Sequence, residues 1–304
     1  MGFDVNGSRF LIYAKTLGVS FEKTATLGRQ EMQINATQLR RNLADFGFHT
    51  TAEEAERLSK ESQGYAESFL KRLGAREVAS MDASDFEQAT CVHDFNVPIP
   101  DELKNRFTAV VDGGTLEHIF NLPVAIKNCM EMVRVGGHFI GISPTNNWPG
   151  HGFYQLSPEL FFRVFCRQNG YKIVKIIVYE DKPLAKWYEV IDPDLVKHRV
   201  TFVNSTQTYL GIIAQRIEAV EPFRSCPQQS DYVAQWTSTE NAAEPSAAQP
   251  LSLYRKARRL LAPARNYFYW KVYWKALRFY RKFSPFDPRF FKPLADPPID
   301  RNPS

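Results

Sequence analysis

The sequence predicts an α/β fold of the doubly wound type, built on a mostly parallel sheet. Short apolar runs alternate at least four times with segments of helical periodicity, which is typical of α/β domains. Acidic residues follow three successive predicted strands, at Asp82, Asp94 and Asp112. Ligands of such sheets bind beyond the carboxyl ends of the strands, so we expect a binding site at that edge.

The clearest strand–helix–strand unit lies between residues 107 and 144. An apolar β-branched run over 109–111 stops at Asp112-Gly113-Gly114, as a buried strand ending in a tight turn does. Apolar residues recur at helical spacing after Pro123, which suits a first helical turn. We expect Gly136-Gly137 to end this helix and a second buried strand to begin at Phe139.

The other elements are predicted from periodicity, capping residues and closing glycines. Helices are expected over residues 9–19, 36–46, 51–63, 65–73 and 160–167. Strands are expected over residues 23–27, 77–81, 90–93, 172–179 and 207–215. The turn-rich stretch 145–155 (TNNWPGHGFYQ) is expected to be a loop at the carboxyl end of a strand, where functional side chains often lie.

Composition narrows the class of protein. With 304 residues and 44% hydrophobic residues, the chain can form a sizeable core. The four cysteines lie far apart without metal-type spacing, so we expect reduced thiols and no metal site. No apolar run approaches the ~20 residues of a membrane span, and the first residues lack the layout of a secretory signal. These features predict a cytoplasmic protein.

Four motifs between residues 23 and 216 carry a family resemblance. They are SMDA around Asp82, VHDFN around Asp94, VVDGGTLEHI around Asp112, and the run EHIFNLPVAIKNCMEMVRVGGHFI, which is the most specific. With these motifs the stretch resembles a class I S-adenosylmethionine-dependent methyltransferase. The resemblance implies a seven-stranded, Rossmann-like sheet whose last strand is antiparallel, with S-adenosylmethionine as cofactor.

The resemblance also implies a role for each residue at the sheet edge. Asp82 would hold the ribose hydroxyls of the cofactor and Asp94 would meet its adenine amino group. Asp112 and Gly113 would lie at the methionine end, and Gly28 is the remaining glycine of the turn after the first strand. A carboxylate suits the first role because it can accept hydrogen bonds from both hydroxyls.

The turn after the first strand departs from the family pattern. The family has an acidic residue and three glycines there, whereas this chain has Ala-Thr-Leu-Gly-Arg-Gln at positions 25–30. Arg29 adds a positive charge close to where a sulfonium would bind. The departure favours a non-catalytic binding or scaffold protein with the same fold, and the retained acidic residues favour an enzyme.

Three residues are candidates for the chemistry of methyl transfer, namely Glu117, His118 and His151. Methyl transfer needs an aligned acceptor, and a hydroxyl acceptor must also lose its proton. The pKa of an unperturbed imidazole lies near neutrality, so His118 or His151 can be the general base. The alternative for Glu117 and His118 is a hydrogen-bonding role towards a neighbouring loop. We assign His93 to the cofactor edge, and the other histidines structural roles: His49, His138 and His198.

The carboxyl-terminal part of the chain differs in composition from the rest. We divide the chain into a methyltransferase-like domain (1–221), a linker (222–252), a basic amphipathic helical segment (253–284) and a proline-rich tail (285–304). The segment 253–284 contains ten Lys or Arg and no Asp or Glu. This segment therefore has a charge of +10. Since the net charge of the whole chain is +5, the remaining residues together carry −5.

The segment 253–284 also contains ten aromatic residues, and three kinds of binding partner are consistent with this composition. A basic, Trp- and Tyr-rich amphipathic helix is typical of an interfacial anchor on an anionic membrane, here the inner face. It can also dock on the domain or on a partner subunit, or it can bind nucleic acid through phosphate contacts and stacking.

The sequence thus predicts a methyltransferase that acts on a hydroxyl of a small-molecule or glycan-linked acceptor, peripherally at the cytoplasmic membrane face. The alternatives are a non-catalytic scaffold and a nucleic-acid methyltransferase.

Overall fold

The computed structural model describes residues 2–196, 200–240 and 286–295, together with Phe268, Lys271, Val272 and Lys275. The chain divides into two compact units. The first unit comprises Met1–Val190, Thr206–Pro227 and Lys292–Ser304, and the second comprises Ile191–Ser205 and Gln228–Phe291. All the site residues predicted from the sequence belong to the first unit.

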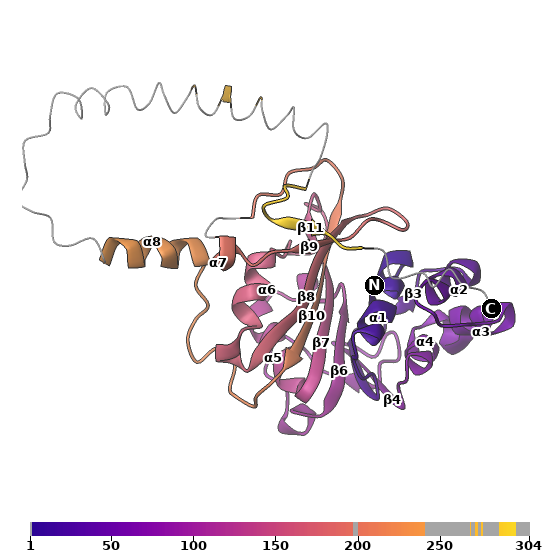
Figure 1. The fold of residues 1–304 in the computed structure, drawn as a ribbon. Coiled ribbons are helices and arrows are strands. Elements are labelled where there is room, and N and C mark those ends of the chain that lie inside the picture. Colours follow the sequence, from indigo (N-terminus) through magenta and orange to yellow (C-terminus); the bar gives the residue numbers. More distant parts are fainter. Residues whose placement is uncertain are drawn as a thin grey trace, which may run out of the picture. The chain divides into compact units, whose positions relative to one another are not determined.

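A mostly parallel sheet with helices on both faces forms the first unit (Figure 1). Its seven central strands are β2 (Lys23–Leu27), β4 (Glu77–Asp82), β5 (Cys91–Val92), β6 (Phe107–Gly113), β7 (Val133–Asn146), β8 (Tyr171–Glu180) and β10 (Thr208–Arg216). They lie in the order β8-β10-β7-β6-β2-β4-β5, and β10 is antiparallel to both of its neighbours. The sheet thus confirms the predicted α/β class and the antiparallel last strand, but it has nine strands instead of the predicted seven.

Two strands that the sequence analysis did not predict extend this sheet beyond β8. They are β9 (Tyr188–Val190) and β11 (Phe291–Pro293), in the order β11-β9-β8. A separate two-stranded parallel sheet joins β1 (Gly2–Phe3) to β3 (Glu31–Met32). Strands of two or three residues carry no readable alternation of apolar and polar residues, which is why they were missed.

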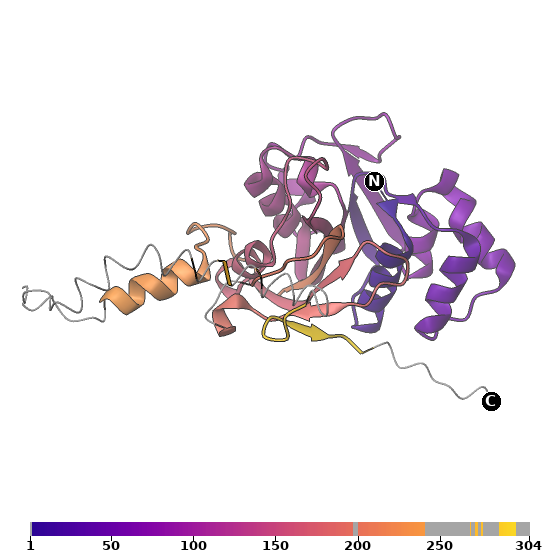
Figure 2. The same cartoon turned by 90° about the horizontal axis from the view of Figure 1, so that it is seen from above.

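The helices of the first unit lie on opposite faces of the sheet (Figures 1 and 2). One face carries α1 (Val5–Thr16), α2 (Ala36–Asp45), α3 (Ala52–Lys60) and α4 (Glu67–Arg72), and the other carries α5 (Leu122–Met132) and α6 (Pro158–Val164). The 3₁₀ turns are η1 (Glu61–Gly64), η2 (Asp101–Leu103), η3 (Leu116–His118) and η4 (Arg167–Asn169). This two-faced arrangement makes the fold doubly wound.

Capping explains where several helices begin. Asn35 and Gln38 form a reciprocal capping box at α2, and Ser157 caps α6, as the sequence indicates. Helix α1 begins at Val5 rather than at Arg9. Asp4 caps it by accepting a hydrogen bond from the Gly7 amide at 2.7 Å.

The glycine pair 136–137 does not end α5, so that prediction was wrong. Helix α5 ends at Met132, and the glycines lie inside β7. A Cβ on Gly137 would lie 2.8 Å from the Thr108 carbonyl oxygen of β6. The glycine there serves close packing of two neighbouring strands.

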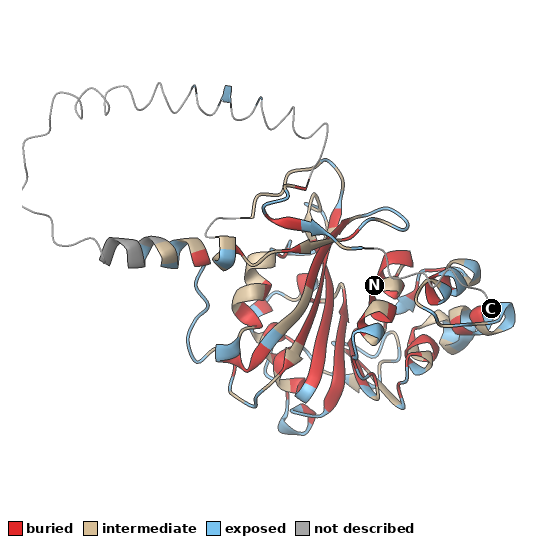
Figure 3. Cartoon of the chain, in the orientation of Figure 1, coloured by how far each residue is buried: buried red, intermediate tan, exposed pale blue. Residues whose placement is uncertain are grey.

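The core lies on both faces of the middle strands β2, β6, β7 and β10, most of whose residues are buried (Figure 3). Every residue of β6 is buried, as the apolar run predicted. Each buried Val or Phe side chain contributes roughly 1.5–3 kcal/mol relative to an exposed one. This rigid strand therefore fixes the position of Asp112 and Gly113 at its carboxyl end.

The second unit contains α7 (Pro193–Val196) and α8 (Ser230–Glu240). Helix α8 falls within the stretch 222–252 that the sequence analysis interpreted as a linker. The expected basic helix over 253–284 lies outside the described residues apart from four positions. Among the described residues, no helix has both the length and the apolar character that crossing a membrane requires.

Candidate functional site

The carboxyl ends of β2, β4 and β6 meet at one edge of the sheet. Leu27 at the end of β2 pairs with Met81 on one side and with Asp112 on the other. Asp82 follows Met81, so Asp82 and Asp112 lie on either side of the end of β2. Asp94 follows β5, the next strand beyond β4. The sequence thus correctly placed the three acidic residues at one edge.

Asp82 and Asp94 are both held by local hydrogen bonds. Oδ1 of Asp82, which is half-buried, accepts a hydrogen bond from the Ser84 amide at 3.1 Å. Oδ1 of the exposed Asp94 accepts hydrogen bonds from the backbone and side-chain amides of Asn96, at 2.9 and 2.8 Å. These bonds lower the pKa of Asp94, the backbone bond contributing most. Asp94 is therefore a firmly ionised acceptor at the edge.

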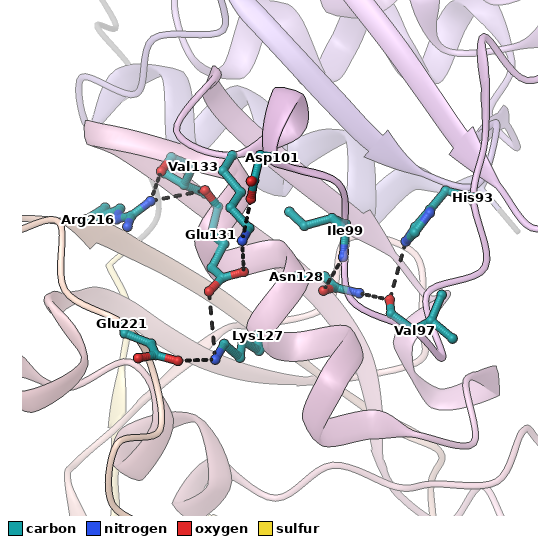
Figure 4. Close-up of polar contacts among 11 residues, drawn as sticks. His93, Val97, Ile99, Asp101, Lys127, Asn128, Glu131, Val133, Arg216 and Glu221 are labelled. Carbon is teal, nitrogen blue, oxygen red and sulfur yellow. Dashed lines mark hydrogen bonds and ion pairs between the residues drawn. The ribbon is translucent and has the colours of Figure 1, made fainter.

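The loop that carries Asp94 is anchored to α5 by Asn128 (Figure 4). Oδ1 of Asn128 accepts a hydrogen bond from the Ile99 amide at 3.1 Å, and its Nδ2 donates to the Val97 carbonyl at 2.8 Å. Nε2 of His93 lies 3.3 Å from the same carbonyl oxygen, so His93 belongs to this anchor. Asn128 could not be singled out from the sequence, because a single amide side chain on a helix gives no signal.

Asp112 is fully buried and only half satisfied. Its Oδ1 accepts hydrogen bonds from the amides of Thr115 and Leu116, at 2.8 and 3.3 Å. Its Oδ2 has no hydrogen-bond partner among the residues that the structure describes. Desolvation raises the pKa of Asp112 from 3.8 to about 7. A buried carboxylate with an unused oxygen indicates a ligand-facing role rather than a structural one.

The turn after β2 is closed by ion pairing instead of by glycines. Gly28 adopts the left-handed conformation, with φ of 69°. Nε of Arg29 donates to Glu67 Oε1 at 2.7 Å, and its Nη1 donates to the Glu87 carbonyl at 3.0 Å. The guanidinium also lies 4.1 Å from the centre of the Tyr65 ring. Glu67 therefore neutralises the positive charge of Arg29, which from the sequence was expected to lie close to a bound sulfonium.

The space beside Gly113 is filled by two side chains of this chain. A Cβ on Gly113 would overlap Oε1 of Gln30 and lie 2.8 Å from Cε1 of Phe3. Both side chains are buried, and β1 with β3 holds the backbone of Phe3 in place. Gly113 thus allows other groups to approach its backbone closely, as the sequence indicated. In this structure the side chains of Phe3 and Gln30 occupy that space.

The polar atoms at this edge fit a positively charged cofactor such as S-adenosylmethionine. Gln30 Oε1 and Asp112 Oδ2 are both buried acceptors, and neither has a donor within the described part of the chain. An ammonium group and a sulfonium are the charges that such acceptors stabilise. Binding there requires Phe3 and Gln30 to withdraw from Gly113.

The three predicted catalytic residues come together from two segments. Glu117 and His118 lie in η3, directly after the turn that follows β6, and His151 lies in the loop after β7. The carbonyl of Glu117 accepts a hydrogen bond from the Phe153 amide at 2.8 Å, which ties the two segments together. Gly152, with φ of 70°, allows this contact, because a Cβ there would lie 2.7 Å from the Glu117 carbonyl oxygen.

In this cluster, one carboxylate and two imidazoles face one another. Nε2 of His151 lies 3.5 Å from Oε1 of Glu117, and the rings of His118 and His151 lie 4.9 Å apart between centroids. Glu117 is fully buried, whereas His118 is exposed and His151 is partly exposed. Desolvation, followed by the charge of Asp112, raises the pKa of Glu117. Partial desolvation, followed by His151, lowers the pKa of His118.

The ring of Trp148 holds His151 in position. This role of Trp148 was not predicted from the sequence. The Trp148 ring lies 5.2 Å from the His151 ring and 4.9 Å from the Tyr209 ring, between centroids. Its Nε1 donates to the Thr208 carbonyl at 3.2 Å. Of the remaining histidines, His138 is buried in β7, and His198 lies outside the described residues.

Comparison with known proteins adds remote structural likenesses only. No family model and no curated protein matches this sequence. Among solved structures, the chain is similar to 1,6-didemethyltoxoflavin-N1-methyltransferase from Burkholderia thailandensis, which was solved with 1,6-didemethyltoxoflavin and S-adenosylhomocysteine bound. The identity is 14%, the TM-score is 0.35, and the match covers 70% of this chain and 78% of that one.

Two further solved structures give similar values. The antibiotic-resistance methyltransferase Kmr has 14% identity and a TM-score of 0.30, with 70% of this chain and 94% of that chain covered. A variant of the 16S rRNA (adenine(1408)-N(1))-methyltransferase from Catenulisporales acidiphilia has 11% identity and a TM-score of 0.31, with 69% and 92% covered. Because these identities and TM-scores are low, the fold is assigned from the order and directions of the strands within this chain. Its sheet, with the last strand antiparallel, is the class I methyltransferase fold.

Proposed function

We propose that this chain is an S-adenosylmethionine-dependent methyltransferase that methylates a hydroxyl group of a small-molecule or glycan-linked acceptor. One observation carries the proposal, namely that cofactor-type acceptors and a proton-accepting cluster share one sheet edge. Asp82 and Asp112 flank the end of β2, and the cluster of Glu117, His118 and His151 directly follows β6. Ligand binding at this edge is the rule for open α/β sheets.

Each acidic residue has a role that its surroundings allow. Asp82 accepts hydrogen bonds from the ribose hydroxyls of the cofactor, and Asp94 accepts one from the adenine amino group. Asp112 accepts a hydrogen bond from the ammonium of the methionine part, through an oxygen atom without another partner in the described chain. When bound, the cofactor supplies a methyl group already activated by a sulfonium.

The acceptor side is formed by the two imidazoles and by exposed aromatic rings. His118 and His151 are accessible from solvent, and either can take the proton of an acceptor hydroxyl. Phe120 and Phe153 are exposed and pack edge to face, with 5.7 Å between their centroids. The Tyr154 hydroxyl donates to the Phe120 carbonyl at 2.7 Å, which fixes this surface. Such rings suit the apolar face of a sugar or an aromatic acceptor.

The cellular setting rests on the sequence of residues 253–284. We propose a cytoplasmic enzyme that this basic aromatic segment brings to an anionic membrane face. Co-sedimentation with phosphatidylserine vesicles tests this proposal, using the full chain and a chain ending at Ser252. Equal sedimentation of both chains would refute it.

One observation favours a non-catalytic scaffold as the second candidate. Phe3 and Gln30 fill the approach to Gly113, where the methionine part of the cofactor has to lie. If these side chains never withdraw, the chain keeps the fold and binds no cofactor. The two candidates therefore differ in cofactor binding.

Calorimetric titration with S-adenosylhomocysteine distinguishes these candidates. We expect micromolar binding by the wild-type chain, and Asp82→Ala to weaken it about tenfold or more, because hydrogen bonds to a charged acceptor contribute about 1.5–3 kcal/mol. Asp85→Ala is the matched control, since it removes an exposed carboxylate from the same turn. Absence of binding at millimolar ligand, or equal weakening by both substitutions, would contradict the proposal.

A further inference from the structure

The cluster of Glu117, His118 and His151 has a second property that its catalytic assignment does not use. One ligand atom from each residue lies within 4.8 Å of the other two. Two ligands of a tetrahedral Zn²⁺ lie about 3.4 Å apart, since each bond is about 2.0–2.2 Å long. The side chains therefore have to close in by up to roughly 1.4 Å to bring all three atoms onto one ion. We propose that these three residues bind a divalent transition-metal cation.

The buried carboxylate is the independent observation that points to a ligand. Glu117 is fully buried, and within the described chain neither of its oxygens has a hydrogen-bond partner. Taking a carboxylate out of water without a partner costs several kcal/mol. Among the described residues, the nearest basic side chain is His151, whose Nε2 lies 3.5 Å from Oε1 of Glu117. A bound cation would stabilise the deprotonated form of Glu117, which burial disfavours.

The backbone holds the three ligands in position before any ion arrives. Glu117 and His118 are neighbours in η3, and the Phe153 amide bonds to the Glu117 carbonyl. The His151 ring is packed between the rings of Trp148 and His118, at centroid distances of 5.2 and 4.9 Å. Ligands placed on hydrogen-bonded elements in this way bind a metal with little loss of side-chain freedom.

The ligand chemistry selects the class of ion. Two imidazole nitrogens and one carboxylate suit Zn²⁺, Co²⁺, Mn²⁺ or Fe²⁺, whereas Mg²⁺ and Ca²⁺ prefer oxygen ligands alone. His118 is exposed and His151 is partly exposed, so further coordination positions face solvent. A site with three protein ligands and an open position is the arrangement of catalytic rather than structural zinc.

The chemical consequence rests on the proposed methyltransferase function, whereas the binding of the ion does not. An acceptor hydroxyl that coordinates the ion loses its proton to water more readily, because the cation stabilises the alkoxide. In the metal-bound state the two imidazoles act as ligands and not as bases. The ion would thus activate the hydroxyl in their place.

The sequence analysis predicted no metal site, because an argument from sequence spacing does not find a cluster like the one proposed here. His151 is far from the adjacent pair 117–118 in sequence, and it lies in a different loop. Metal motifs are recognised by short fixed spacings within one segment. Here the hydrogen bond between Phe153 and Glu117 brings the third ligand in.

The test uses the full chain, freed of metal by a chelator and then titrated with Co²⁺ or Zn²⁺ alone. We expect one equivalent of Co²⁺ to give visible d–d absorption, and Zn²⁺ to displace it. His151→Ala and Glu117→Gln should each weaken binding by more than about 100-fold, since even outer partners of a metal contribute about 10–100-fold. His49→Ala is the matched control, because it removes an exposed histidine elsewhere.

Three outcomes would overturn the metal site. They are absence of Co²⁺ and Zn²⁺ binding at millimolar concentration, equal loss in His49→Ala and His151→Ala, and a thiolate-to-metal absorption that assigns the ion to a cysteine. Circular dichroism of each variant establishes that it is folded. Titration with S-adenosylhomocysteine separates this inference from the proposed function. Retained cofactor binding without metal binding refutes only the ion site, and loss of cofactor binding with metal binding intact refutes only the proposed function.

Discussion

The substitution Asp112→Asn should stabilise the protein at neutral to alkaline pH while weakening cofactor binding. Asp112 is fully buried, its Oδ2 has no partner in the described chain, and desolvation raises its pKa from 3.8 to about 7. The native state therefore binds a proton more tightly than the unfolded state does. The free energy of unfolding then falls as the pH rises from about 4 to about 7, and the loss is complete above pH 7.

The size of the effect follows from the pKa change. Each pKa unit corresponds to about 1.4 kcal/mol, so the raised pKa of Asp112, whose charge also acts on Glu117, costs the wild type on the order of 1–4 kcal/mol above pH 7. Asparagine keeps an oxygen that can accept hydrogen bonds from the Thr115 and Leu116 amides, and it carries no charge. We therefore expect the variant to be more stable than the wild type at pH 8, by roughly 1–4 kcal/mol, and by much less at pH 5.

Urea denaturation at pH 5 and pH 8 measures this difference. A companion titration with S-adenosylhomocysteine should show weaker binding by the variant, because the negative charge opposite the ammonium is lost. The reasoning would be refuted if Asp112→Asn were less stable than the wild type at pH 8. It would also be refuted if the two proteins had the same pH dependence.

Three further substitutions probe the surroundings of the site. Phe3→Ala should lower the free energy of unfolding by about 3–5 kcal/mol, because it removes a buried ring. It should also raise the affinity for S-adenosylhomocysteine, because it opens the space beside Gly113. A fall in the calorimetric affinity, or the same effect from the exposed Phe86→Ala, would contradict this. Gly152→Ala should cost about 1–3 kcal/mol in urea denaturation, because its φ is 70° and its Cβ meets a carbonyl, whereas Gly150→Ala meets nothing and should be neutral. Asn128→Ala should cost about 1–3 kcal/mol and weaken S-adenosylhomocysteine binding by loosening the loop of the edge, and unchanged stability would show that the anchor contributes nothing.

Much of the first unit could be predicted because its strands and caps are encoded locally. The apolar run over 109–111 became the fully buried strand β6, and Asn35 capped α2 at the expected residue. Parallel strands place their carboxyl ends at one edge, so Asp82 and Asp112 could be assigned to a common edge of the sheet from the sequence alone. Such features depend on neighbours in sequence or on a simple topological rule.

The parts that could not be predicted depend on contacts between distant residues. Phe3 reaches Gly113 only because β1 pairs with β3, and two-residue strands leave no periodic pattern. Gln30 follows Gly28 and Arg29 in the turn after β2, and nothing in its local sequence shows that its side chain turns inwards. The joining of His151 to Glu117 depends on one backbone hydrogen bond and on the conformation of Gly152.

A crystal structure of the full chain with S-adenosylhomocysteine tests the central claim most directly. We expect the ligand to lie across the carboxyl ends of β2, β4 and β6, with its ribose at Asp82 and its amino acid part at Asp112. We also expect Phe3 to have withdrawn from Gly113. A ligand bound elsewhere, or a bound ligand with the Phe3–Gly113 contact unchanged, would contradict it.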